Sequence, residues 1–155
     1  MKIQKKFTTE TAHIVREASS IRCKNNIHGH SYTWIVTIQG GLDHAGMIID
    51  FKDLKPIKDF IDLFDHATVF WSKEPDCEIL AFFQDKFSRV LIMKQNPTAE
   101  NMARSLFKFT KDWLQKDYPT LSVAEVAVWE TATGCGIATE CNGNDILVYT
   151  HSDTN

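Results

Sequence analysis

The sequence predicts an α+β domain with a mainly antiparallel sheet and its helices on one face. Along the 155 residues, predicted strands are followed by helices and then by strands again, and neighbouring strands are close enough to form hairpins. Hydrophobic residues make up 43% of the chain and charged residues 24%, as in an ordinary globular protein. This length suits one domain with a real core, so we expect residues 1–155 to form a single domain.

The first predicted elements are two long strands. Residues 3–13 are rich in threonine and contain aromatic and branched side chains, which is typical of a strand. Residues 14–27 lack periodicity and are expected to form a loop. In residues 32–38, large apolar side chains alternate with Thr33, Ile35 and Thr37, which predicts a strand with one strongly apolar face. Gly40-Gly41 ends this strand, and we expect residues 47–51 to pair back on it.

Helices dominate the middle of the chain. Apolar residues recur at helical spacing in Lys52–Phe64, which predicts an amphipathic helix. Residues 72–78 are expected to form a polar loop, and residues 79–93 a short helix followed by a strand. Asn96-Pro97 indicates a helix start, with Asn96 as N-cap and Pro97 as the first helical residue. The buried face of that helix is formed by Met102, Leu106, Phe109 and Trp113, and Pro119 ends it.

The last elements are again strands. Residues 123–130 predict a strand whose face carrying Val126 and Val128 is continued by Glu130. Asn142-Gly143 is typical of a two-residue hairpin turn, here joining residues 137–141 to residues 146–150.

Composition excludes several function classes. The formal net charge is −3, so bulk charge does not indicate nucleic-acid binding, and an anionic substrate would need a local basic pocket. No apolar run is long enough to span a bilayer, and the start of the chain lacks an apolar signal region, so we expect a cytoplasmic protein. The chain has no C-x-x-C pair, and each of its cysteines is expected to be a small buried hydrophobe or a working thiol: Cys23, Cys77, Cys135 and Cys141.

The most informative segment is Cys23–His30. His28 and His30 are two residues apart at the start of a strand, so their imidazoles lie on one face and make half of a metal site. His13 ends the first strand, and if the two strands pair, three imidazoles converge. Three histidines leave a fourth zinc position open, as in catalytic sites. The alternatives are two ordinary strand histidines for His28 and His30, and a satisfied core or surface histidine for His13.

Other polar residues have both a functional and a structural interpretation. Cys23 is either a loop cysteine or a thiol that a nearby dication would acidify. Asp65-His66 follows the first long helix, as a catalytic pair or as a helix end favoured by the dipole. Glu130 continues a core-facing pattern, so it either meets a ligand with two N–H groups or ends the strand in solvent. His44 and His151 are expected at the surface.

An ordered set of segments closely resembles the 6-pyruvoyltetrahydropterin synthase and 6-carboxytetrahydropterin synthase family. The set covers most of the chain in the family's order: Phe7 through Ala12-His13, Cys23 before His28-Gly29-His30-Ser31-Tyr32, Gly46 to Phe51, Asp65-His66, Pro97 to Asn101, and Glu130-Thr131.

The resemblance implies a tunnelling fold, in which a four-stranded antiparallel sheet carries two helices on one face. Three such sheets close into a β-barrel and two barrels stack into a hexamer, a dimer of trimers, with active sites between subunits. By the same resemblance Zn²⁺ is the cofactor, Cys23 is the catalytic thiol, and Asp65 and His66 act on it from a neighbouring subunit. Glu130 would anchor the pterin edge. The implied residues are His13, His28 and His30 for zinc, and Thr98, Glu100 and Thr131 near the ring.

The implied substrate is 7,8-dihydroneopterin triphosphate. The favoured activity is a lyase that releases acetaldehyde and triphosphate and leaves 6-carboxytetrahydropterin for queuosine and other deazapurines. The alternatives are the pyruvoyl synthase, which only eliminates triphosphate, and a non-catalytic pterin- or purine-binding homologue. Between Cys23 and His28 this chain has four residues, whereas the carboxy branch usually has three and the animal pyruvoyl branch five. Residues 72–93 and the C-terminal hairpin look like additions.

Overall fold

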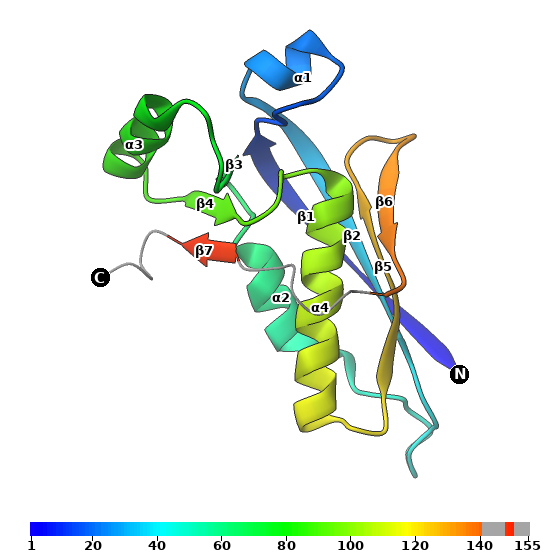
Figure 1. The fold of residues 1–155 in the computed structure, drawn as a ribbon. Coiled ribbons are helices and arrows are strands. Elements are labelled where there is room, and N and C mark those ends of the chain that lie inside the picture. The colour runs from blue at the N-terminus through cyan, green and yellow to red at the C-terminus, as the bar shows by residue number, and fades with distance from the viewer. Residues whose placement is uncertain (141–147, 151–155) are drawn as a thin grey trace.

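The computed structural model describes residues 1–140 and 148–150. Its strands are β1 (Lys2–His13), β2 (His28–Gln39), β3 (Thr68–Trp71), β4 (Val90–Met93), β5 (Ser122–Trp129), β6 (Cys135–Ala138) and β7 (Val148–Thr150). Its helices are α1 (Ile21–Asn25), the 3₁₀ turn η1 (Phe51–Leu54), α2 (Lys55–Asp62), α3 (Cys77–Lys86) and α4 (Ala99–Asp117). The described strands form one sheet in the order β6-β5-β2-β1-β3-β4-β7 (Figure 1).

The sheet is built around the antiparallel pair β1–β2. Its register joins Phe7 to Trp34 and continues to the far end, where His13 faces His28. Strand residues alternate between faces, and in β2 the side chains of Tyr32, Trp34 and Val36 are all buried. Both predicted N-terminal strands are therefore confirmed, together with the apolar face of the second.

Helices α2 and α4 lie against the same face of the sheet (Figure 1). The helical spacing of apolar residues explains this packing, because Ile57 and Ile61 of α2 and Met102 and Leu106 of α4 are at most 1% exposed. Each such side chain contributes about 1.5–3 kcal/mol through burial. The predicted α+β class, with the two main helices on one face, is confirmed.

The sheet has more strands than expected, and its strands are not all antiparallel. The predicted four-stranded antiparallel sheet is present as β6-β5-β2-β1. Beyond β1, however, β3 pairs parallel to β1 and β4 parallel to β3, so the sheet is mixed. The helix α3 provides the crossover connection that the parallel strands β3 and β4 need. The short strand β3 was not predicted, because its residues have no clear pattern in the sequence.

The C-terminal hairpin is a second correction. Strand β6 pairs with β5, whereas β7 pairs with β4, so the two lie at opposite edges of the sheet and do not form a hairpin with each other. The turn predicted at Asn142-Gly143 lies outside the described residues. A local turn signal specifies a bend, but the free edge at β4 offered β7 another partner.

Three local predictions also change. Residues 47–50 form no strand; Asp50 instead caps η1, where it accepts a hydrogen bond from the backbone N–H of Lys52 at 2.9 Å. The predicted helix 52–64 is therefore divided into η1 and α2. The predicted loop 14–27 contains α1, which Ser20 caps. The N-cap of α4 is Thr98 rather than Asn96. In each case a side-chain oxygen caps the backbone N–H groups of the new helix end.

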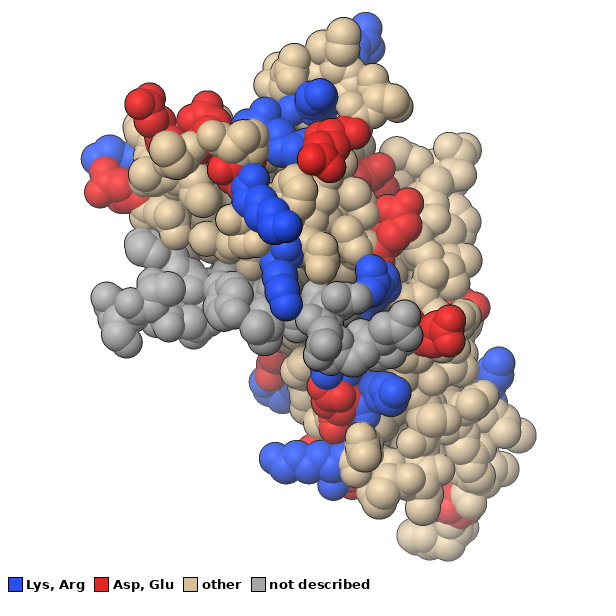
Figure 2. Space-filling view, viewed as in Figure 1, with Lys and Arg blue, Asp and Glu red and all other residues tan. Residues whose placement is uncertain are grey.

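The predicted helix and strand in residues 79–93 are confirmed as α3 and β4. On α3, Phe83 packs against the buried Phe70 of β3, with ring centroids 5.2 Å apart. In the described part of the chain, no helix has the length and apolar character to cross a membrane. Figure 2 shows acidic and basic side chains interspersed over one face of the molecule.

Gly136 of β6 lies directly against the backbone at the start of α4. A Cβ built there would lie 2.5 Å from the backbone nitrogen of Glu100 and 2.6 Å from Cα of the same residue. We predict that Gly136→Ala destabilises the protein by about 1–3 kcal/mol, because backbone must move to relieve the clash. Urea unfolding at fixed protein concentration measures this. Gly41→Ala is the control, since a Cβ there meets nothing within 4 Å; equal midpoints for the two variants would contradict the prediction.

Candidate functional site

Three imidazoles meet at one end of the β1–β2 pair. His13 ends β1, and His28 and His30 begin β2, with one ligand nitrogen from each lying within 4.8 Å of the others. The pairing of His13 with His28, and of Thr11 with His30, brings the rings onto the same face. The predicted convergence of the three histidines is therefore confirmed, and the group could hold a metal ion.

The hydrogen bonds of the outer nitrogens favour the metal-binding form of two rings. Nδ1 of His13 lies 2.7 Å from the carbonyl oxygen of Pro97, and Nδ1 of His28 lies 3.0 Å from the carbonyl oxygen of Asn26. A carbonyl can only accept, so each Nδ1 carries the proton and each Nε2 presents a lone pair. These two Nε2 atoms are 3.1 Å apart, and a cation between two such lone pairs would remove their repulsion. The residues therefore fit a metal ion.

His13 is the most buried member of the group, with no exposed surface. Burial lowers the pKa of His13 from 6.5 to about 4, although the Pro97 carbonyl and Glu130 oppose the shift. The imidazole is thus neutral at neutral pH, which is the state that binds metal.

Glu130 follows β5 and reaches the same cluster. Its Oε1 accepts a hydrogen bond from the Tyr32 hydroxyl at 3.0 Å and lies 3.4 Å from Nε2 of His13 and 4.0 Å from Nε2 of His30. Burial first, and then the charge of Glu130, raise the pKa of Tyr32 far above its usual range, so the hydroxyl keeps its proton and donates. With its side chain 32% exposed, Glu130 also has surface available to a ligand.

A pocket of about 360 Å³ opens beside the histidines and contains several of the predicted site residues. Cys23 of α1 and His28 line it, together with Glu130 and the start of α4. Thr98, as N-cap, and Glu100, in the first turn, bring two further predicted residues to the wall. The structure thus places a free thiol, one histidine of the three-imidazole group and a carboxylate around one pocket.

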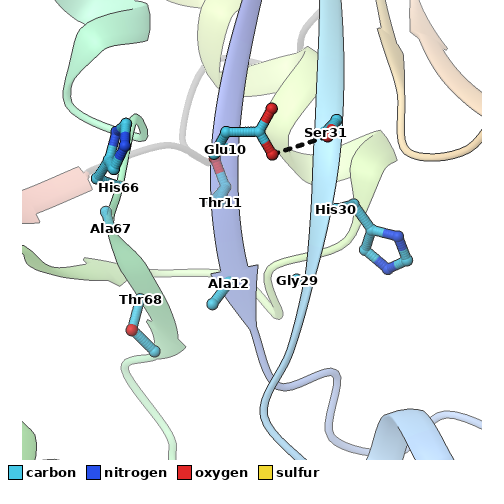
Figure 3. A pocket seen from close by; sticks show the side chains of 9 residues that line it. All are labelled: Glu10, Thr11, Ala12, Gly29, His30, Ser31, His66, Ala67 and Thr68. Atoms are coloured by element: carbon cyan, nitrogen blue, oxygen red, sulfur yellow. Dashed lines mark hydrogen bonds between the residues drawn. The ribbon is translucent and has the colours of Figure 1, made fainter.

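Asp65 and His66 lie elsewhere, on the open face of the strand pair. His66 lines a different pocket of about 390 Å³, whose wall also includes His30, and in Figure 3 the His30 ring points away from His66. Glu10 on β1 fixes the pair, since its backbone N–H donates to Asp65 Oδ1 at 2.9 Å and its carbonyl accepts from the N–H of His66 at 2.7 Å. His66 takes a left-handed φ of 56°, a strained conformation that concentrates at functional sites.

The two side chains of this pair interact directly. Nδ1 of His66 lies 3.0 Å from Oδ2 of Asp65. The backbone N–H of Glu10, and then His66, hold the pKa of Asp65 below its usual range. The side chain of His66 is 73% exposed, so it is accessible to another molecule. Within one chain the pair does not share a pocket with Cys23.

Thr131 is the other predicted residue that the structure separates from the group. It lines a pocket on the open face with Ser31 and Thr33, whereas Glu130 lines the pocket of Cys23. Adjacent residues at a strand end point to opposite faces, which explains the split. His44 is exposed, as predicted, and His151 lies outside the described residues.

Comparison with known proteins agrees with this geometry. The family model described as 6-pyruvoyl tetrahydropterin synthase matches residues 2–141. The chain belongs to this family. It is 36% identical to the 6-carboxy-5,6,7,8-tetrahydropterin synthase of Helicobacter pylori, over 86% of this chain and 70% of that protein. It is 34% identical to the synthase of the same name from Haemophilus influenzae, over 85% of this chain and 94% of that protein.

Solved structures of this fold are also similar. An uncharacterized protein from Wolinella succinogenes superposes with a TM-score of 0.77 at 22% identity, covering 90% of this chain and 97% of that one. The 6-pyruvoyl tetrahydropterin synthase of Caenorhabditis elegans gives a TM-score of 0.65 at 23% identity, covering 91% and 96%. The tunnelling fold that the sequence resemblance implied is therefore confirmed.

Two residues at this site, one behind the pocket and one in its wall, were not singled out from the sequence. Tyr32 shares strand parity with His28 and His30, so the alternation that grouped the histidines also placed its hydroxyl in the site. Cys135 lines the pocket beside Cys23, but no spacing pattern connects these two cysteines in the sequence. Strand parity could have found the first, whereas the second depends on how β6 returns beside β5.

We predict that the metal-free protein loses stability on acidification from pH 6.5 to about 4. The pKa of His13 is lower in the folded than in the unfolded state, so in this range the unfolded chain binds more protons and the free energy of unfolding falls with pH. The loss from this residue reaches about 3 kcal/mol near pH 4. Urea midpoints across the range, compared with those of His13→Gln, isolate its part. Parallel profiles for the two proteins would contradict the assignment.

Proposed function

We propose that this chain is a zinc-dependent lyase that converts 7,8-dihydroneopterin triphosphate to 6-carboxytetrahydropterin, with release of acetaldehyde and triphosphate. The observation that carries the proposal is the three-imidazole group beside a pocket lined by Cys23 and Glu130. The name shared by the curated relatives supports the carboxy product.

The donor set suits zinc, because three neutral imidazoles leave one tetrahedral position for substrate. A zinc ion held by His13, His28 and His30 would supply Lewis acidity to the side-chain hydroxyls of the substrate. Glu130 has an oxygen next to the metal-ligand histidines and a partly exposed carboxylate, so it can accept two N–H bonds from the aminopyrimidinone edge of a pterin. Tyr32 holds Glu130 in place by donating to Oε1. Thr98 and Glu100 lie close to the bound ring.

Proton transfer is assigned to Cys23 and to the pair Asp65–His66. As a thiolate, Cys23 would take a proton from the substrate side chain next to the ring. Asp65 orients the imidazole of His66, which would relay protons. Since Cys23 and His66 line different pockets of one chain, their cooperation requires a neighbouring copy. We therefore propose an oligomer with active sites between subunits, built as a hexamer of two trimers, with Thr131 facing such a contact.

The pyruvoyl synthase is the second candidate, because the family model carries that name and the spacer after Cys23 has an intermediate length. The two activities share zinc, the pterin and the elimination of triphosphate, and differ in cleavage of a carbon–carbon bond. Acetaldehyde is thus the product that separates them. A non-catalytic pterin-binding protein is disfavoured by the presence of Cys23, Asp65 and His66.

Removal of one imidazole should remove the metal. We predict that His13→Ala, His28→Ala and His30→Ala each bind zinc at least about 10-fold more weakly, since the loss of a ligand exceeds the effect of losing an outer hydrogen bond. Metal analysis of purified protein and competition with a chelator measure this. His44→Ala is the matched control, because His44 is exposed and outside the cluster. Full zinc content in the His28→Ala and His30→Ala variants would contradict the metal assignment.

The activity is tested by incubating zinc-loaded protein with 7,8-dihydroneopterin triphosphate. We expect acetaldehyde and triphosphate in equal amounts, and a rate at least about 100-fold lower for Cys23→Ser, which loses the acidic thiol. Cys77→Ser is the control, since Cys77 is exposed at the start of α3, outside the pocket of Cys23. Triphosphate without acetaldehyde would select the pyruvoyl reaction, and an active Cys23→Ser would remove the thiol from the mechanism.

A further inference from the structure

We propose that the buried ion pair between Arg16 and Glu74 is a positioning device for the thiol of Cys23. It would fix α1, which carries Cys23, to the turn after β3, and so set where the thiol lies relative to the metal-ligand histidines. The inference rests on the proposed function for the role of Cys23, and its geometry stands independently.

The ion pair is enclosed and has several hydrogen bonds. The side chain of Glu74 has no exposed surface, and that of Arg16 is 16% exposed. Nε of Arg16 donates to both carboxylate oxygens, at 2.9 and 3.1 Å, and Nη2 donates to Oε1 as well. Oε1 also accepts from the backbone N–H of Asp76 at 3.1 Å. A planar guanidinium gripping one carboxylate in this way fixes orientation as well as distance.

The third nitrogen of the guanidinium extends this grip to α1. Nη1 of Arg16 donates to the carbonyl oxygen of Lys24 at 3.0 Å, and the neighbouring N–H of Val15 donates to the carbonyl oxygen of Cys23 at 3.2 Å. Two successive carbonyl groups, one of them that of Cys23, are thus held by residues 15 and 16. The direction of the Cys23 side chain follows from how these carbonyl groups are held.

Apolar packing does not hold α1 in place. The helix has five residues, Ile21–Asn25, and none of them is buried. A helix this short is not stable on its own, because nucleation costs more than one turn of hydrogen bonds returns. Ser20 caps the helix by accepting from the N–H of Cys23 at 3.5 Å, and beyond its last residue the carbonyl of the C-cap Asn26 meets Nδ1 of His28 at 3.0 Å. The position of α1 therefore depends mainly on polar contacts, and those to Arg16 and Val15 hold the carbonyl groups at and next to Cys23.

The same arginine is also tied to the opposite wall of the pocket. The backbone carbonyl of Arg16 accepts a hydrogen bond from Nδ2 of Asn96. The backbone carbonyl of Asn96 in turn accepts from Nδ2 of Asn101 at 2.9 Å. The next residue, Pro97, accepts from Nδ1 of His13. Arg16 therefore contacts the thiol segment through its side chain and the loop that leads to Thr98 through its backbone carbonyl. That loop also supports His13, a proposed metal ligand.

The energetics favour a positioning role over a purely stabilising one. Desolvation offsets much of the attraction in a buried ion pair, so such a pair contributes little net stability, but removal of one charge leaves the other buried and uncompensated. In Glu74→Gln, the guanidinium of Arg16 would turn toward water. Among the described contacts, the other partner of its side chain is the Lys24 carbonyl, so this hold on α1 would be released.

We expect Glu74→Gln to lower kcat by about 10- to 100-fold, as a misplaced catalytic group does, with little change in KM or zinc content. Alkylation of Cys23 by iodoacetamide, followed by peptide mass spectrometry, should become several-fold faster as α1 opens. Glu74→Asp keeps the charge and should recover part of both effects. Asp59→Asn is the matched control, since it breaks an exposed ion pair with Lys55 on α2 and should leave both readouts unchanged.

Two results would overturn the inference. One is an unchanged kcat and an unchanged Cys23 alkylation rate in Glu74→Gln. The other is an equal loss of zinc, oligomer and activity in Glu74→Gln and Glu74→Asp, which would assign the pair a general structural role. The alkylation rate separates this test from that of the proposed function. If the parent protein forms no product, the proposed function fails. The alkylation rate of Cys23 in the zinc-loaded protein still shows whether Glu74 holds Cys23 in place.

Discussion

The register of β1 against β2 is the constraint on which the site depends. Opposition of His13 and His28 puts the three imidazoles on the face that, farther along the same strands, carries Tyr32 and Trp34 into the core. A slip of one residue would exchange the faces of a whole strand, exposing Trp34 and separating the histidines. The apolar core therefore fixes the geometry of the three imidazoles, because the side chains that stabilise the sheet also select the register in which these rings meet.

Because this polar cluster is buried, its groups need hydrogen-bond partners among the neighbouring residues. Between the core and the histidines lies a band of hydrogen-bonded groups on the same face, in which Thr9 accepts from Nε1 of Trp34 at 2.9 Å and Thr11 donates to the carbonyl of Phe64 at 2.8 Å. Next come the Tyr32 hydroxyl and Glu130. Each polar group in this band has a partner, so the change from apolar core to metal-binding end avoids unsatisfied buried donors.

The sequence was informative where local periodicity and final packing agree, as in the strands around the histidines and in α4. The sequence predicted the three-imidazole group because His28 and His30 lie on one face of β2, and His13 at the end of β1 reaches that face once the two strands pair. It failed where a distant partner decides the structure: β3 and β7 depend on which sheet edge is free, and Asn96 bonds to Arg16 instead of capping a helix. The Arg16–Glu74 pair joins residues 58 apart in sequence, which no local pattern records.

The two halves of the site are supported differently, and this bears on the four-residue spacer between Cys23 and His28. Lys24 and Asn25 complete α1, Asn26 is extended with ψ 139°, and its carbonyl meets Nδ1 of His28 at 3.0 Å. A change in spacer length would therefore lengthen or shorten the end of α1 and leave the ladder of β1 and β2 intact. The three histidines belong to the paired strands β1 and β2, whereas the thiol belongs to a short helix held by polar contacts. The position of the thiol can thus change with the spacer while the three-imidazole group stays in place.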